Sequence, residues 1–338
     1  MRRWLPFRLA RWMFVCFLAS AVGLAHAQQI PTLRARTNLV LVPTLVEAKT
    51  GEPVFNLTAK DFLVTDDGVE QNIHLDTETY AQPISIVVLL QVGRSAVREF
   101  YKYQGLPTLI DALAGNTVHR VAVVAFDSRP RMLQDFTSNP EAIQQAIYGI
   151  QPGDDGAAIL DSVWYAVDML KDEPPQNQRV IVLLSETRDS GSVTPMKEVI
   201  RKIGESDVIV YSLAFSPGRE DALEFSAPEG NGFQLLPALK MAIAALKKNS
   251  AAAIPHMTGG QYLRFNSGKE LDRQIAMLAN QVHNRYMITF RPSDLTPGMH
   301  VLDVKLRQPL PVRVLARTSY WATSPTAVLE AAPTPGSH

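Results

Sequence analysis

Apolar and polar positions follow one dominant pattern in the middle of this chain. Short, continuous apolar runs such as ISIVVLL (84–90) and RVIVLLS (179–185) alternate with longer stretches in which apolar residues recur at helical spacing. The runs are typical of strands buried on both faces of a sheet, and the stretches between them predict amphipathic helices. Strands that alternate with helices predict an α/β fold with a doubly wound, mostly parallel, Rossmann-like sheet. We expect strands over 84–90, 120–126, 131–136, 179–185, 207–215 and 261–265, and helices up to about 113 and over 141–150, 157–170, 196–205, 235–248 and 269–283.

Both ends of the chain show a β pattern instead. The segment NLVLVPTLVEA (38–48) is rich in Val and Leu, and Asp67-Gly68 stands between two β-type runs. An Asp-Gly pair in that position is a strong hairpin signal. Near the other end, HVLDVKLR (300–307) alternates apolar and polar residues, as a half-exposed strand does. We predict that the C-terminal strands pack with the N-terminal β segment, because about fifty residues form only a small core alone.

The first residues have the pattern of an export signal. Four arginines without an acidic residue precede an apolar run from Trp12 to Leu24, and Ala25-His26-Ala27 follows as an A-x-A cleavage site. This order predicts a secretory signal peptide and a protein that is periplasmic or secreted after cleavage near Ala27. The apolar run is too short to span a bilayer comfortably, which disfavours an uncleaved membrane anchor. Such an anchor is the alternative to cleavage, and it is the one association with a membrane that we expect.

Composition and charge narrow the function classes. The chain has 338 residues, 46% hydrophobic and 20% charged, which excludes a fibre, a wholly disordered chain and a polytopic membrane protein. A net charge of +0 gives no basic surplus for nucleic acid. Removal of the signal peptide leaves 29 basic against 33 acidic residues and removes the single cysteine, Cys16. Disulfide frameworks and cysteine metal sites are therefore excluded from the mature protein.

These patterns predict five segments. We expect a signal peptide over 1–27, an N-terminal β segment over 28–80, the α/β domain over 81–290, C-terminal β strands over 291–322 and a disordered tail over 323–338.

The order of several motifs resembles the von Willebrand factor A-related family of exported bacterial proteins, the acidobacterial group. The motifs are GEPVFNLTAKDFLVTDDGVEQNI, NSAAAIPHMTGGQY, NRYMITFRP and HVLDVKLRQPLPVRVLARTSYWA, and the resemblance covers about residues 39 to 322. It implies a von Willebrand A-type α/β domain with flanking β segments. It also implies a place for a divalent cation, because A-type domains hold one in a metal-ion-dependent adhesion site beyond the carboxyl ends of the strands.

The sequence departs from the family at that metal site. The family pattern is D-x-S-x-S after the first strand, a Thr in a middle loop and an Asp after the fourth strand, which supply hard oxygen ligands. The corresponding positions here are Gln91, Gly93, Ser95, Ala157 and Glu186. Ser95 alone matches, and Arg94 adds a positive charge that opposes cation binding. We therefore expect a degenerate site without a metal cofactor.

One alternative keeps a metal at this place. Mg²⁺ or Mn²⁺ would then use Ser95 and Glu186, with help from Asp154, Asp155 or Asp161. For Asp161 a role in capping or orienting a helix is the competing interpretation, and for Asp154-Asp155 a solvated turn.

No motif indicates catalysis. The histidines make no HExxH or other close metal pair, the GxSxG elbow is missing, and Gly268-Lys269 lacks the upstream glycine of a phosphate-binding loop. The first hypothesis is therefore an exported, non-enzymatic interaction module for a protein or polymer partner of the cell envelope or beyond it. The second is a metal-dependent ligand binder with an altered site, and the third is a hydrolase. In the first, the partner contacts the loops 91–95, 153–158 and 186–192, where Arg94, Arg188 and Asp189 supply polar groups.

Overall fold

The computed structural model describes residues 39–76, 82–115, 117–215 and 235–323. The predicted signal peptide and all but the first residue of the predicted tail lie outside these ranges. Among the described helices, none is long and apolar enough to cross a membrane.

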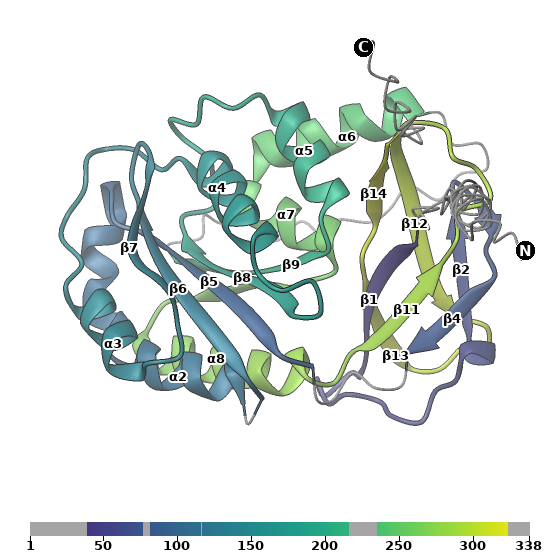
Figure 1. Ribbon diagram of the computed structural model, residues 1–338, viewed down its shortest axis with the longest axis horizontal. Coiled ribbons are helices and arrows are strands. Elements are labelled where there is room, and N and C mark those ends of the chain that lie inside the picture. Colours follow the sequence, from purple (N-terminus) through teal and green to yellow (C-terminus); the bar gives the residue numbers. More distant parts are fainter. Residues whose placement is uncertain (1–38, 77–81, 116, 216–234, 324–338) are drawn as a thin grey trace, which may run out of the picture. The chain divides into compact units, whose positions relative to one another are not determined.

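The central element is a six-stranded sheet, with the strand order β10-β9-β8-β5-β6-β7 (Figure 1). Five of its strands are parallel, and β7 pairs antiparallel with β6 at one edge. Every residue of β5 is buried, as the continuous apolar run predicts. This sheet confirms the predicted α/β, doubly wound fold. Its strands are β5 (Ile84–Gln91), β6 (His119–Phe126), β7 (Pro130–Thr137), β8 (Gln178–Ser185), β9 (Val208–Phe215) and β10 (Tyr262–Phe265).

Helices cover both faces of this sheet, and alternate strand residues point to opposite faces. Val88 and Leu90 pack with η3, α2, α3 and α8, whereas Val87 and Leu89 pack with α4, α5, α6 and α7. The two helix layers lie below and above the sheet in Figure 1. Their bounds are η3 (Arg94–Gly105), α2 (Leu106–Ala114), α3 (Pro140–Tyr148), α4 (Ile159–Lys171), α5 (Met196–Glu205), α6 (Leu235–Lys248), α7 (Ser250–Thr258) and α8 (Gly268–Val282).

Two four-stranded sheets combine strands from both ends of the described chain. Their orders are β13-β1-β11-β4 and β14-β12-β2-β3, and they share a core that includes Phe62, Ile288 and Phe290. The strands are β1 (Val40–Ala48), β2 (Phe62–Asp66), β3 (Val69–Glu70), β4 (Ile73–Asp76), β11 (Tyr286–Phe290), β12 (Gly298–Leu306), β13 (Val312–Ala316) and β14 (Ser319–Ala322). A short 3₁₀ helix, η1 (Ala59–Asp61), precedes β2.

The pairing of β11 corrects one predicted boundary. We placed the end of the α/β domain at residue 290, but β11 pairs with β1 and β4 and has no place in the six-stranded sheet. The change from the α/β domain to the β sheets therefore comes just after α8. The apolar residues of β11 did not reveal which sheet it joins, because they suit a strand in either sheet.

Two buried arginines connect the β sheets to the α/β domain. Arg317 donates from Nη2 to the carbonyl of Gly204 at 2.6 Å, and Arg285 donates from Nε to the Tyr211 hydroxyl at 2.9 Å. A side chain at Gly204 would bring its Cβ to 2.8 Å from the Cβ of Trp321. The β sheets and the α/β domain therefore pack directly against each other at these points, without space for water-mediated contacts.

Candidate functional site

Three loops meet at the carboxyl edge of the six-stranded sheet. The Gly153 amide donates to the carbonyl of Val92 at 2.9 Å, and the Arg94 amide donates to that of Asp154 at 3.2 Å. Ala157 and Ser190 exchange backbone hydrogen bonds of 2.7 and 2.9 Å. The structure thus brings together the predicted segments 91–95, 153–158 and 186–192. This follows from the parallel strands, whose carboxyl ends share one edge.

Glu186 occupies the centre of this edge, and its carboxylate already has protein partners. Its Oε1 accepts hydrogen bonds from the Ser95 hydroxyl at 2.5 Å and from the Ser95 amide at 3.3 Å. Its Oε2 lies 3.6 Å from Nε of Arg94. The Gln91 side chain accepts a hydrogen bond from the Glu186 amide at 2.8 Å. Charge and hydrogen-bonding capacity at this position are therefore largely satisfied within the chain.

Gly93 has no room for the serine that the adhesion-site pattern requires. A Cβ at this position would lie 2.4 Å from the carbonyl oxygens of both Asp154 and Gly156. A Cβ on Gly156 would in turn lie 2.3 Å from the backbone nitrogen of Ser128. Because the opposing atoms belong to the backbone, the loops would have to separate to admit a side chain.

The residues at the five ligand positions do not fit a divalent cation. Ser95 and Glu186 bind each other, and the Gln91 amide oxygen accepts from the backbone. Gly93 and Ala157 carry no side-chain oxygen, and Ala157 is fully buried. Mg²⁺ and Mn²⁺ need several oxygen ligands that are free to point at the ion, and these five residues do not supply them.

Two of the residues that we predicted to contact a partner also hold the loops together. Asp189 Oδ1 accepts from the Leu160 amide at 2.9 Å and from the Ser192 hydroxyl at 2.6 Å, so it binds the first turn of α4. The exposed Arg188 donates from Nε to the carbonyl of Lys248 at the end of α6, at 3.2 Å. Cations are favoured at a helix C-terminus and anions at an N-terminus, so both placements stabilise the loop.

Two of the three acidic residues considered as extra ligands, Asp161 and Asp154, bind groups of the protein. Asp161 accepts from the amides of Val193 and Thr194, each at 2.9 Å, and so fixes the loop before α5. Asp154 accepts from the Ser128 hydroxyl at 2.8 Å and from the Gly156 amide at 2.8 Å. These hydrogen bonds, that of Ser128 first, lower the pKa of the Asp154 carboxyl because they stabilise its charged form.

Asp127 is a site residue that the sequence reasoning missed. It follows β6 directly, its carbonyl accepts from the Ala158 amide at 2.7 Å, and its Oδ1 accepts from the Arg129 amide at 3.3 Å. Its side chain is buried against Gly153, because a Cβ added to Gly153 would lie only 2.4 Å from Oδ2 of Asp127. An acid directly after a buried strand was the available signal, because it must lie at the same sheet edge as Gln91 and Glu186.

A separate hollow of about 590 Å³ opens between η3 and the end of α3. Aromatic side chains line it, among them Phe100, Tyr101 and Tyr148. The Tyr148 hydroxyl donates to the carbonyl of Gln104 at 2.9 Å and so joins the two elements. The hollow contains none of the predicted site residues.

Comparison with known proteins gives a family for the central domain. Residues 89–189 match the model of the von Willebrand factor type A domain. This range runs from β5 to the loop after β8 and includes every predicted site residue. The match confirms the predicted von Willebrand A-type domain in this part of the chain, which contains none of the motifs quoted for the resemblance. No curated protein matches the chain.

Several solved structures are similar to this chain. An aerotolerance-related membrane protein from Bacteroides fragilis, with multiple mutations to serines, is 15% identical, with 58% of this chain and 98% of that one covered and a TM-score of 0.41. Proximal thread matrix protein 1 from the mussel byssus, with a zinc-occupied MIDAS motif, is 16% identical, with coverage of 65% and 50% and a TM-score of 0.41. A point mutant of the PilB minor pilin from Streptococcus sanguinis is 12% identical, with coverage of 62% and 63% and a TM-score of 0.39.

Proposed function

The chain contains a von Willebrand factor type A-related domain, and from this premise we propose that it is an exported, non-enzymatic interaction module. The module binds a protein or polymer partner through the loops 91–95, 153–158 and 186–192, without a bridging metal. Domains of this family generally act in interaction and not in catalysis, and their binding face is the carboxyl edge of the sheet.

One observation carries the proposal that no metal is used. The carboxylate of Glu186, at the position of the family's aspartate, binds Ser95 and Arg94 of its own chain. A cation would have to break the 2.5 Å hydrogen bond and displace the guanidinium to reach this carboxylate. The positive charge of Arg94 also opposes its approach. Direct contact between side chains and partner is the mode of binding that remains.

The exposed side chains of this edge carry both charges. Arg94, Arg129 and Arg188 are exposed, and so are Asp154 and Asp155. Val193 adds an apolar side chain that is 87% exposed. Mixed charges around an apolar contact favour a partner of complementary pattern, because charge pairs at the rim fix orientation and exclude wrong partners.

Site-specific crosslinking in the native envelope tests the binding face. A photoreactive residue at Val193 should give one dominant crosslinked partner, identified by mass spectrometry. The same residue at Arg273, which is exposed on α8, is the matched control and should not give that product. The Val193 product should decrease at least about tenfold in the Arg94→Ala, Arg188→Ala double variant. An equal yield from both positions, or no loss in the double variant, would contradict this face.

Calorimetry separates the metal-free module from the alternative binder with an altered site. We expect no Mg²⁺ or Mn²⁺ binding that depends on Glu186. Micromolar binding that disappears in Glu186→Ala would show that the altered site is functional and would overturn the metal-free mechanism.

A further inference from the structure

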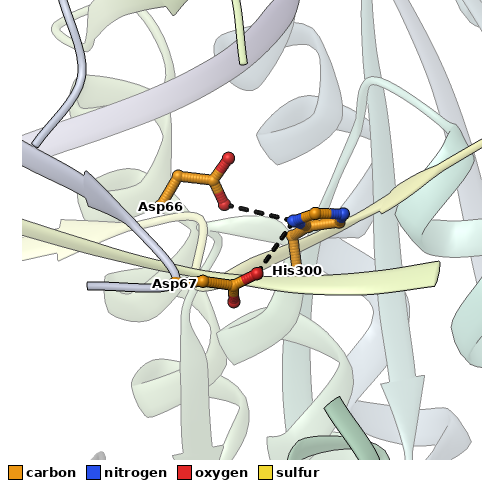
Figure 2. Close-up of side chains that lie close together, drawn as sticks. All are labelled: Asp66, Asp67 and His300. Carbon is orange, nitrogen blue, oxygen red and sulfur yellow. Dashed lines mark ion pairs between the residues drawn. The ribbon is translucent and has the colours of Figure 1, made fainter. Parts of the chain in front are cut away.

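Asp66, Asp67 and His300 form a cluster in the β sheets, outside the loops described above (Figure 2). Asp66 ends β2, Asp67 begins the two-residue turn to β3, and His300 lies on β12 opposite Tyr320 of β14. Asp67 has a φ of +48°, and the following Gly68 one of +83°. An Asp-Gly pair suits such a turn, which places the Asp67 side chain beside His300 and Val301 of β12.

Each of the three side chains has one polar atom fixed by the surrounding protein. Asp66 Oδ2 accepts from the Tyr320 hydroxyl at 2.7 Å, and Asp67 Oδ1 accepts from the Val301 amide at 2.9 Å. His300 Nε2 lies 2.7 Å from the carbonyl oxygen of Thr296. A carbonyl can only accept, so Nε2 carries a proton and donates it.

The other polar atom of each side chain faces one common point. His300 Nδ1 lies 2.9 Å from Asp67 Oδ2 and 3.5 Å from Asp66 Oδ1, and Figure 2 shows both carboxylates directed at this nitrogen. The side chains of His300 and Asp66 are 1% and 3% exposed. Nδ1 and Asp66 Oδ1 nevertheless have no hydrogen-bond partner. Leaving two such buried atoms unpaired is costly, so they indicate a missing positive group.

Either a proton or a metal ion can supply that charge. A proton on Nδ1 would give an ion pair with the carboxylates, but the atoms do not have the geometry of an N–H···O hydrogen bond. For a metal, bonds of about 2.0–2.2 Å would span the two separations between Nδ1 and the carboxylate oxygens at angles of about 85–115°. In each side chain the polar atom that does not face the common point is hydrogen-bonded to the protein. Metal-binding His and Asp residues have such hydrogen bonds, which orient them toward the ion.

We propose that Asp66 Oδ1, Asp67 Oδ2 and His300 Nδ1 bind a divalent transition metal ion of the zinc class. An imidazole with two carboxylates suits Zn²⁺ better than Mg²⁺ or Ca²⁺, which prefer oxygen ligands alone. Three protein ligands leave a fourth position open to water or to a partner's side chain. The ion can enter beside Asp67, whose side chain is 29% exposed. The site is independent of the proposed binding face on the six-stranded sheet.

Zinc titration of the full-length chain, purified and stripped of metal with a chelator, tests the site. Calorimetry should give one equivalent of Zn²⁺ bound, with no comparable binding of Mg²⁺. Co²⁺ at the same site should give visible absorption bands with the intensity of a four-coordinate ion. We expect Asp67→Asn to weaken zinc binding at least about tenfold and His300→Gln to abolish it.

Asp67→Asn keeps the test decisive if the buried His300 variant does not fold, because Asn is also favoured in this turn. Asp303→Asn, an exposed change on β12, and Glu186→Gln at the sheet edge are the controls and should bind zinc as the parent does. Absence of stoichiometric zinc binding, or equal binding by Asp67→Asn, would overturn the proposal. So would nitrogen NMR that shows both His300 ring nitrogens protonated at saturating zinc, because an ion pair would then account for the cluster.

Discussion

The sheet edge around Glu186 and the cluster around His300 both place carboxylates beside a basic side chain, yet they differ in what those carboxylates bind. At the edge, Glu186 has the Ser95 hydroxyl and amide and the Arg94 guanidinium as partners. In the cluster, Asp66 Oδ1 and His300 Nδ1 are buried without a hydrogen-bond partner.

The difference teaches that proximity of acids does not by itself make a metal site. The family resemblance directs attention to the edge, where the oxygens are already used and Gly93 leaves no space for a further ligand. The residues of the cluster lie in two of the motifs that carry the family resemblance, but nothing in those motifs marks them as ligands. Each of their side chains is fixed by one atom and has the other directed at a common point. Free, oriented ligand atoms are the physical requirement, and of these two regions the cluster alone has them.

The largest expected effect comes from restoring the adhesion-site serine. Gly93→Ser would place a Cβ 2.4 Å from two backbone oxygens, so we expect a loss of about 3 kcal/mol in the free energy of unfolding. Denaturant unfolding measures it, with Val97→Ser, an exposed change in the next helix, as the control. A stable Gly93→Ser variant that gains Mg²⁺ affinity would show that the edge is a latent metal site, and the contrast with the cluster would fail.

A second change removes one supporting contact of the cluster. Tyr320→Phe deletes the hydroxyl that donates to Asp66 at 2.7 Å and leaves a second oxygen of this buried carboxylate unpaired. We expect the free energy of unfolding of the metal-free protein to fall by about 2 kcal/mol, measured by chemical unfolding. Tyr148→Phe, which deletes an exposed hydroxyl bonded to Gln104, should cost less than about 0.5 kcal/mol. If Tyr320→Phe and Tyr148→Phe lowered the free energy of unfolding equally, burial would not distinguish the cluster from an exposed hydrogen bond.

The corresponding change at the edge should have a smaller effect. Ser95→Ala deletes the hydroxyl that binds Glu186, but this partly exposed carboxylate keeps the Ser95 amide and Arg94. We expect a loss of about 1 kcal/mol in the same unfolding measurement. A loss larger than that of Tyr320→Phe would reverse the order of the two regions.

The smallest effect concerns the loop held by Asp154. The hydrogen bonds from Ser128 and Gly156 lower the pKa of this carboxyl below its ordinary value of 3.8. The stabilisation is therefore present above pH 3.8 and is lost as the pH falls through the lowered pKa of the folded protein. Hydrogen exchange of the Gly156 amide should accelerate at that acidic end relative to the intrinsic rate. Asp154→Asn should remove this pH dependence, and Asp155→Asn should leave it; a dependence that survives Asp154→Asn would contradict the assignment.

Much of the sheet edge was predictable from the sequence, and the reason is topological. Once the buried runs at 84–90 and 179–185 are placed as parallel strands, Gln91 and Glu186 must lie at one edge. The hydrogen bond between Ser95 and Glu186 was not predictable, because it depends on how closely the loops approach. Asp127 was missed although its position after a buried strand carried the same signal.

The sequence by itself determined the α/β class, the hairpin at Asp67-Gly68 and the degenerate set of ligands at the edge, because these depend on local periodicity, turn chemistry and residue type. Only the tertiary structure decided that β11 leaves the α/β domain to pair with β1, and that His300 from one end of the described chain meets Asp66 and Asp67 from the other. The physical reason is that strand pairing between distant segments is set by the packing of whole sheets, and no local pattern encodes which buried atoms remain without a partner.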